Sequence, residues 1–316
     1  MLLLATVMWG YSFPAGKALL LALAAELPGR SGWFFDAATL SVRFGIAALI
    51  LWALRPRFML RVTADEWSEG IGLGLTMGIG MLFQFDGLHH TTASAVAFLT
   101  QGSAVLVPIY VMVRDRQRPP PRTVLCVAMV MAGVSILGRF DFQTLRFGRG
   151  EAETLLSAVI FTAAILWLDR AHFRRNHRGR VSMVMFAVIA LVLAPVWLWH
   201  ARSPADLQVL WASWPIAVIF ASLLCLCSLF AFLTMNKWQP HLDATTAGIV
   251  YTTEPLLGTG FALFLPSPLS RWLGIAYENE RFTVNLFIGG LLITAANVII
   301  ALQPAPHQTP ISDAID

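Results

Sequence analysis

The chain has 316 residues, of which 57% are hydrophobic and only 13% are charged. Soluble proteins average roughly 25% charged residues, so this composition excludes an ordinary water-soluble globular protein. The net charge of +4 does not indicate nucleic-acid binding, because the basic residues lie in short clusters between long apolar runs. The three cysteines lie inside those runs, so neither a disulfide framework nor a metal site is expected.

Ten apolar runs follow one another along the chain. Each approaches the roughly 20 residues that a helix needs to cross a hydrocarbon core, and none shows the alternation of a strand. We therefore predict an all-α membrane protein with ten transmembrane helices. The runs are Leu2–Ala25, Phe34–Leu54, Ser68–Leu88, Ala93–Val113, Thr123–Gly138, Ala152–Leu168, Ser182–Trp199, Ser213–Met235, Ala244–Leu265 and Thr283–Leu302.

The basic residues between the runs predict the orientation in the membrane. Thirteen Lys and Arg residues lie in one set of alternate connections and seven in the other. Cytoplasmic loops carry the excess of positive charge, so both termini are predicted in the cytoplasm. A multi-pass protein of the cytoplasmic (inner) membrane is the expected localisation.

The fourth and ninth runs indicate an internal repeat. A shift of 151 residues aligns Ala97–Ser103 with Gly248–Glu254, and a Thr-rich segment precedes both. A shift of five spans is odd, so the two segments cross the membrane in opposite directions, as in an inverted repeat. We predict five-helix repeats at residues 1–140 and 141–303, followed by a cytoplasmic tail at 304–316. Inverted repeats place a binding site near the midplane and expose it to each side in turn, which is what a transporter requires.

Four segments carry a family resemblance: MWGYSFPAGKALL at Met8–Leu20, SVRFGIAAL at Ser41–Leu49, TTASAVAFLTQGSAVLVPIY at Thr91–Tyr110 and ATTAGIVYTTEPLLG at Ala244–Gly258. They resemble the EamA-type family of the drug/metabolite transporter superfamily. This resemblance implies two repeats of five helices, both termini inside, and movement of small metabolites or drugs, often outward.

One connection departs from the family pattern. The segment from Pro266 to Phe282, before the tenth run, is longer than the usual short turn. Its Leu269–Tyr277 part, which includes Trp272, is expected to form an interfacial helix.

Glu254 is the main candidate for function. It lies ten residues after Ala244, about 15 Å along a helix and therefore near the midplane. Pro255 follows it and is predicted to break the helix, as is Pro108 in the fourth run. Because an intramembrane charge is costly, Glu254 indicates a substrate or proton site. A structural ion pair that holds two helices together is the alternative, and both interpretations stay open.

Two cations are predicted to share one depth in adjacent helices. Lys17 lies eight residues before Ala25, and Arg43 lies nine residues after Phe34. Unpaired cations would repel each other, so an acidic partner, a water-filled cavity or an anionic substrate is expected nearby. The alternative is structural: Lys17 extends to the outer surface and Arg43 caps backbone carbonyls.

Polar and aromatic side chains complete the candidate site. Tyr251 and Glu254 are three residues apart and share a helix face, and Trp9 and Phe13 are four apart and offer aromatic surface to a planar ligand. Packing between helices is the alternative role for each of them. The further candidates are Gln84, Asp86, Thr100, Gln101, Ser103 and Thr252.

The leading hypothesis is a secondary transporter in a lipid bilayer, an exporter of a small-molecule solute, coupled to protons through Glu254. No phosphate-binding loop occurs, which disfavours ATP-driven pumping. A membrane-embedded enzyme acting on a lipid-like substrate is the second hypothesis, but no HExxH or GxSxG string occurs. A non-transporting membrane scaffold is the third. No cofactor and no nucleic acid is expected, and a homodimer is compatible with the sequence.

Overall fold

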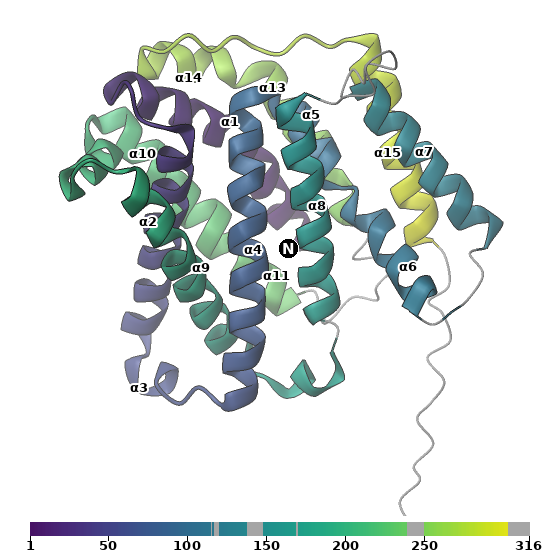
Figure 1. The fold of residues 1–316 in the computed structure, drawn as a ribbon, viewed down its shortest axis with the longest axis horizontal. Coiled ribbons are helices and arrows are strands. Elements are labelled where there is room, and N and C mark those ends of the chain that lie inside the picture. Colours follow the sequence, from purple (N-terminus) through teal and green to yellow (C-terminus); the bar gives the residue numbers. More distant parts are fainter. Residues whose placement is uncertain (115, 117–119, 138–147, 169, 239–249, 303–316) are drawn as a thin grey trace, which may run out of the picture.

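The computed structural model describes residues 1–114, 116, 120–137, 148–168, 170–238 and 250–302. Within these ranges every regular element is a helix and no strand occurs (Figure 1). The helices are α1 (Leu2–Glu26), α2 (Gly32–Leu54), α3 (Pro56–Met59), α4 (Ala64–His90), α5 (Ala93–Thr100), α6 (Ser103–Arg114), α7 (Pro121–Leu137), α8 (Arg149–Leu168), η1 (Ala171–Arg175), α9 (Arg178–His200), η2 (Pro204–Trp211), α10 (Trp214–Ser222), the π-helix η3 (Leu223–Phe230), α11 (Ala231–Trp238), α13 (Thr253–Phe264), α14 (Pro266–Leu273) and α15 (Val284–Ala301).

Seven helices in the described part of the chain are long and apolar enough to cross a membrane, where the sequence predicts ten. They are α1, α2, α4, α8, α9, the continuous α10–η3–α11 and α15. The remaining three predicted runs give shorter helices for different reasons. The fourth run is divided into α5 and α6, and α7 has only 17 residues. The first residues of the ninth run lie outside the described residues, and α13 begins only after the turn at Thr252, so it has 12 residues.

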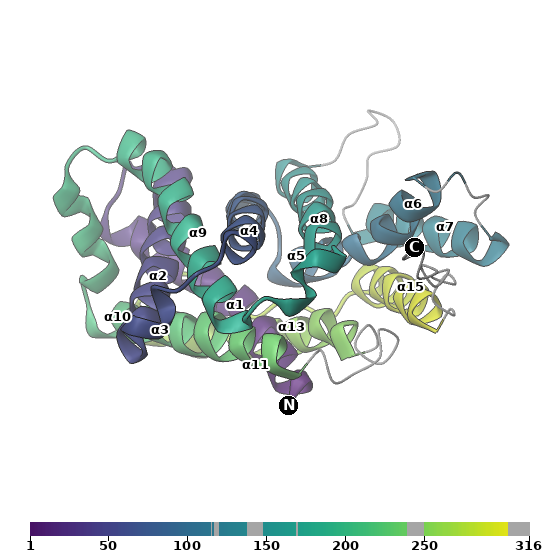
Figure 2. The same cartoon turned by 90° about the horizontal axis from the view of Figure 1, so that it is seen from below.

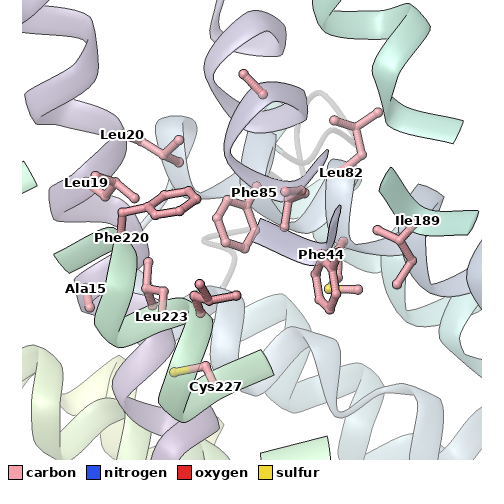
Figure 3. Close-up of a cluster of buried hydrophobic side chains, with 14 of the residues drawn as sticks. Ala15, Leu19, Leu20, Phe44, Leu82, Phe85, Ile189, Phe220, Leu223 and Cys227 are labelled. Carbon is pink, nitrogen blue, oxygen red and sulfur yellow. The ribbon is translucent and has the colours of Figure 1, made fainter. Parts of the chain in front are cut away.

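The long helices pack side by side in an elongated arrangement. In Figure 2, α4 lies between α9 and α8, and α6, α7 and α15 gather at one end. One core cluster fills the space among α1, α2, α4, α9, α10 and η3, and Figure 3 shows part of it, including Phe44, Phe85 and Phe220. A smaller cluster joins α5, α6, α7 and α15. Aromatic and aliphatic side chains therefore hold the bundle together in two places.

Equivalent predicted runs contact each other across the bundle. The second and seventh runs form α2 and α9, which pack together, and the fifth and tenth form α7 and α15, which do the same. The first run, α1, contacts α13 of the ninth run, and correspondingly α8 of the sixth run contacts α5 and α6 of the fourth. The contacts thus follow the pattern that a two-fold relation between the halves would produce.

Glycines allow α4 to approach two neighbours closely. A Cβ on Gly70 or Gly74 would lie 2.6 Å from Val184 or 2.5 Å from Val188 of α9. On another face, a Cβ on Gly72 would lie only 2.2 Å from the Trp167 ring of α8. Small residues let helix backbones come close in a membrane, where van der Waals packing drives association.

The fourth run is interrupted before Pro108, which corrects the predicted position of the break. Helix α5 ends at Thr100, α6 begins at Ser103, and Pro108 lies inside α6. The tight turn between them closes with Gln101 N donating to Phe98 O at 3.1 Å. Gly102 follows in the turn, and glycine has little preference for a helix interior. The Ser103 hydroxyl donates to Thr100 O at 3.2 Å, so a side chain replaces a missing backbone donor.

The long connection before the tenth run contains the helix α14, Pro266–Leu273. It begins and ends earlier than the predicted Leu269–Tyr277 segment, because Pro266 suits a first helical position and Gly274, at φ +68°, ends the helix. Trp272 is exposed on it. Further along, Glu280 Oε1 accepts from the backbone N–H of Ala93 at 2.7 Å, which ties this connection to the start of α5.

Candidate functional site

The fourth and ninth segments are both interrupted, at positions 151 residues apart. Gln101, which ends α5, has φ −68° and ψ −5°, and Thr252, which precedes α13, has φ −65° and ψ −12°. The repeat shift predicted from the sequence relates these two residues. Interrupted helices in membrane proteins commonly mark the site of a substrate or ion, because their free backbone groups need partners.

The two interruptions meet through one side-chain contact. Gln101 Nε2 donates to Glu254 Oε2 at 3.4 Å. Glu254 lies in the first turn of α13, where the helix dipole favours a negative charge, and it is half-buried. No cation lies within 4.0 Å of Glu254 among the described residues, so an ion pair does not explain its place.

Pro255 is the third residue of α13, where the sequence predicts a broken helix. It is buried in the first turn of α13, two residues after Thr253. A proline there loses no helical hydrogen bond, since the first backbone N–H groups have no partner within the helix. The interruption therefore lies just before Glu254, and Pro255 defines where α13 begins.

Polar side chains from four helices, α1, α4, α5 and α13, lie near this contact. Gln84 Nε2 of α4 donates to Thr100 Oγ1 at 3.0 Å, and that hydroxyl donates to Val96 O at 2.8 Å. On the side of α1, the hydroxyls of Thr6 and Thr253 are 3.2 Å apart. The structure thus brings the predicted residues Gln84, Thr100 and Gln101 together around the start of α13.

Aromatic rings lie beside Tyr251, which is three residues before Glu254. The Trp9 ring centroid is 6.2 Å from that of Tyr251 and 5.4 Å from that of Phe232. Trp9 Nε1 donates to Cys227 O of the π-helix η3 at 3.2 Å. Phe13, one turn further along α1, packs against Gly258, where a Cβ would lie 3.2 Å from its ring. Trp9 and Tyr251 are therefore neighbours, as a shared site requires, while Phe13 serves the contact between α1 and α13.

The two predicted cations have different surroundings. Lys17 is half-buried and its Nζ donates to Thr91 O at 2.5 Å, with Glu280 the acidic residue within electrostatic range. Arg43 is only 4% exposed, and its Cζ lies 5.0 Å from the centroid of the Phe44 ring and 5.5 Å from that of Phe85. The expected acidic partner is thus present for Lys17, and aromatic rings surround Arg43.

Asp86 belongs to a separate charged cluster. Arg149 Nη2 donates to Asp86 Oδ2 at 2.5 Å, and Arg149 Nε donates to Glu153 Oε1 at 2.8 Å. Ligand atoms of Asp86, His90 and Glu153 lie within 4.8 Å of one another, a spacing that a metal ion would tolerate. Because the Arg149 guanidinium already holds both carboxylates, this cluster is explained as an ion-pair network.

A second ionic cluster joins the N-terminal ends of α4 and α9, at the other end of α4 from Asp86. Arg178 Nη1 donates to Glu69 Oε1 and Asn176 Nδ2 to Glu69 Oε2, each at 2.7 Å. Arg180 Nη1 lies 3.2 Å from Glu66 Oε2. In the sequence the two arginines contribute only to the predicted orientation. Their pairing with the glutamates could not be predicted, because it depends on how α4 and α9 meet in space.

Two cavities have described linings, and Glu254 is in neither of them. One of about 30 Å³, room for a water molecule or two, borders Glu69, Arg178 and Phe232. The other, of about 480 Å³, lies between α4 and α8 beside Gly72 and Trp167. Neither of these two cavities therefore corresponds to the substrate or proton site predicted at Glu254.

Sequence analysis does not find the π-helix η3 or the crossing of α1 with α13. The stretch Leu223–Phe230 is apolar throughout, apart from Ser228, and gives no local sign of widened turns. At the crossing, a Cβ on Gly10 would lie 2.9 Å from Gly258 N. Both features depend on contacts with other helices, and two small residues 248 positions apart are not a recognisable pattern.

Comparison with known proteins agrees with the predicted resemblance. Residues 1–139 match the EamA-like transporter family. Two proteins of Archaeoglobus fulgidus, both described as uncharacterized transporters, are similar to the chain. One is 27% identical over 302 residues, covering 96% of this chain and 85% of the relative, and the other is 24% identical over 238 residues, covering 70% and 76%.

A solved crystal structure of a protein has a similar fold. It aligns with 93% of this chain and 96% of its own, with a TM-score of 0.54 and 19% sequence identity. Together, the family match, the transporters among the relatives and the long apolar helices confirm the EamA resemblance and indicate a multi-pass membrane protein with a transporter role.

Proposed function

We propose that this EamA-like chain is a secondary transporter that exports a small metabolite or drug-like solute across the cytoplasmic membrane by alternating access. The observation that carries the proposal is the contact between two helix interruptions, where Gln101 meets Glu254 at 3.4 Å. A packed structural protein would gain nothing from two broken helices that leave a carboxylate with no cation partner among the described residues. A carrier uses such a place to bind a polar solute.

The transporter is proposed to consist of two inverted repeats with ten spans, at residues 1–140 and 141–303. The contacts between equivalent helices, α2 with α9 and α7 with α15, support this division. The near-identical backbone angles of Gln101 and Thr252 support it as well. Each repeat would supply one interrupted helix to the central site, and rocking of the repeats would expose that site to either side.

The protein is proposed to lie in the cytoplasmic (inner) membrane, with both termini in the cytoplasm. The excess of Lys and Arg in one set of connections supports this orientation. The predicted tail at 304–316 lies outside the described residues. In this orientation the Glu69–Arg178 pair lies at the cytoplasmic end and the Asp86–Arg149 pair at the outer end.

Glu254 is proposed to bind the coupling proton. Its carboxylate accepts a long hydrogen bond from Gln101, and Tyr251, whose ring lies 6.2 Å from that of Trp9, is within electrostatic range of it. A carboxylate so placed loses solvation when it is charged, so proton binding and solute binding can depend on each other. Gln84, Thr100, Gln101, Tyr251 and Trp9 would supply the polar and aromatic contacts to the solute.

Flux measurements in liposomes test this proposal. Purified protein is reconstituted with a pH-sensitive dye inside, and amino acids, nucleosides, sugars, organic anions and cationic drugs are added in turn. We expect one class to discharge an imposed pH gradient, and we expect Glu254→Gln to reduce that discharge to the level of empty liposomes. Glu278→Gln, a change at an exposed acid in the connection after α14, is the matched control. Equal proton flux in wild type and Glu254→Gln would contradict the coupling role.

The two other functions have distinct signatures. An embedded enzyme would convert a lipid-like substrate without moving it, and a scaffold would tolerate apolar replacement of Glu254 and Lys17. The transporter names of the relatives support neither. Solute flux that requires Glu254 would contradict both alternatives in one experiment.

A further inference from the structure

One face of α2 carries a buried polar stripe. Asp36, Thr39 and Arg43 follow one another at spacings of three and four residues, so they share a face of the helix. Their relative exposures are 0%, 0% and 4%. Arg43 is the eleventh residue after Gly32, about 17 Å along the helix axis and so near the middle of the span.

This stripe has several polar atoms that no other group satisfies. Among the described residues, Asp36 Oδ2, Thr39 Oγ1 and two of the three Arg43 guanidinium nitrogens, Nε and Nη1, are buried without a hydrogen-bond partner. A buried donor without a partner is destabilising, and a buried guanidinium is especially so. A stripe with that many free atoms indicates that something else binds there.

The surroundings of Arg43 are aromatic and apolar. The Phe44 and Phe85 rings lie beside its guanidinium, and Cys227 of η3 is within electrostatic range. Figure 3 shows Phe44, Phe85 and Cys227 in one cluster between α2, α4 and the π-helix. π-helical turns are rare and are frequently found at functional sites. Helix η3 packs directly on α2.

The stripe extends from Arg43 to the end of α4. His89 Nε2 lies 2.9 Å from Asp36 Oδ1, and the His89 side chain is 17% exposed. Phe85 and His89 are four residues apart on α4, so they face α2 together. Polar and aromatic groups thus line the contact between α2 and α4 from a partly exposed histidine down to Arg43.

We propose that Arg43 binds the carboxylate of an organic anion whose aromatic body packs against Phe44 and Phe85. A guanidinium presents its N–H groups in a planar fork that matches a carboxylate, and in apolar surroundings such a charge-assisted pair is strong. The flanking rings suit a planar aromatic group at edge-to-face or stacked distance. That this anion is the transported solute rests on the proposed function. That Arg43 binds it does not.

Binding of benzoate to the purified full-length chain tests the proposal. Benzamide has the same ring and shape but no charge, so it serves as the matched probe. We expect benzoate to raise the thermal unfolding midpoint in a saturable manner and benzamide to leave it unchanged. Arg43→Gln is expected to abolish the benzoate response, and Arg271→Gln, at an exposed arginine of α14, to keep it. An equal response to both probes, no saturable benzoate response in wild type, or a wild-type Kd in Arg43→Gln would overturn the assignment.

Arg43→Lys covers the case in which Arg43→Gln does not fold. Lysine keeps the charge but loses the planar fork, so benzoate should still be preferred over benzamide with a Kd at least about tenfold higher. An unchanged Kd in this variant would contradict a role for the guanidinium.

Benzoate flux is measured separately in liposomes. Arg43-dependent binding without flux would keep the anion site and contradict transport of this anion. Flux that does not depend on Arg43 would support the transporter and overturn the site.

Discussion

Gly10 shows how one missing side chain decides a helix crossing. A Cβ at this position would lie 2.9 Å from Gly258 N and 3.0 Å from Leu257 Cβ, so α1 and α13 would have to move apart. We expect Gly10→Ala to cost about 1–3 kcal/mol, the usual cost of forcing extra volume into a packed contact. The thermal unfolding midpoint of the purified protein measures this.

Gly260→Ala on α13 is the control for that prediction. A Cβ there meets nothing within 4 Å, so the change should be neutral or stabilise α13 by about 0.5–1 kcal/mol through helix propensity. Equal midpoints for Gly10→Ala and Gly260→Ala would show that the close crossing of α1 and α13 is unimportant for stability.

Asp206 makes the stability of the connection between α9 and α10 depend on pH. Its desolvation disfavours the charge, but the N–H groups of Arg202 and Ser203 and the Arg30 guanidinium outweigh this and hold the pKa of Asp206 below its usual value. A lowered pKa in the folded state stabilises the protein above the unfolded-state pKa, and this stabilisation is lost as the pH falls through the folded-state pKa.

We therefore expect Asp206→Asn to lower the unfolding midpoint by a few degrees at pH 7. The difference from wild type should shrink as the pH falls below about 4, where the unfolded carboxyl is protonated. Unfolding curves of both proteins from pH 7 to pH 3 measure it, with Glu278→Gln as an exposed-acid control. A difference that grows on acidification would contradict the lowered pKa.

At the level of elements, α4 is the helix on which the packing of the bundle depends. It contacts both α8 and α9, and its glycines differ in how much room they leave. A Cβ on Gly74 would lie 2.5 Å from Val188 Cβ and 2.9 Å from Met185 O, whereas one on Gly78 would lie 3.5 Å from Ile189 Cα. At Gly74 the α9 backbone and a β-branched side chain leave no room for a Cβ. At Gly78 a Cβ would make an ordinary van der Waals contact.

Gly74→Ala and Gly78→Ala form a matched pair one helical turn apart. We expect Gly74→Ala to destabilise the protein by about 1–3 kcal/mol, because Met185 O cannot move without shifting α9. Gly78→Ala should be neutral or slightly stabilising. Thermal unfolding of both variants in the same detergent measures the difference, and a larger loss for Gly78→Ala would contradict the described packing of α4 on α9.

The interruption between α5 and α6 explains why the fourth run is not among the seven long apolar helices. Helices α5 and α6 together cross the distance that one continuous helix would, with the turn at Gln101 between them. An interruption of this kind is tolerated inside a membrane protein because neighbouring side chains satisfy the free backbone groups, as Ser103 does for Thr100 O. A count of uninterrupted apolar helices therefore leaves out a segment that is divided in this way.

For the whole molecule, the orientation in the membrane has a direct test. The segment η1 and the connection after α14 lie at opposite ends of the bundle (Figure 1), and Arg175 in the first and Glu278 in the second are exposed. We expect Glu278→Cys to react with a membrane-impermeant maleimide on intact cells, and Arg175→Cys to react only after permeabilisation. The reverse pattern would place both termini outside.

The native cysteines serve as internal controls in that experiment. Cys126 and Cys227 are buried, and Cys225 is exposed on the middle of an apolar helix. An aqueous reagent should not reach any of them, so wild-type protein should remain unlabelled on both sides. Labelling of Cys225 in intact cells would mean that the π-helix faces water.

The sequence by itself determined the helical membrane architecture and where most helices lie. A backbone in hydrocarbon must satisfy its hydrogen bonds within each segment, so the length and apolarity of a run predict a helix without knowledge of its neighbours. The repeat shift of 151 residues aligned the two segments in which the structure has the caps Gln101 and Thr252, whereas the sequence placed the breaks at Pro108 and Pro255. The helix break predicted at Pro108 was wrong. A proline lacks one backbone donor, but a helix can continue through it, as α6 does.

Only the tertiary structure decided which side chains meet. That Gln101 reaches Glu254, that Lys17 binds Thr91 O and that Arg43 lies between two phenylalanine rings all depend on how the helices are rotated and where they cross. Those rotations follow from close contacts between small residues far apart in the chain, such as Gly10 and Gly258. Helix formation is local and can be predicted from a run of residues, whereas the pairing of helices arises from the packing of the whole bundle.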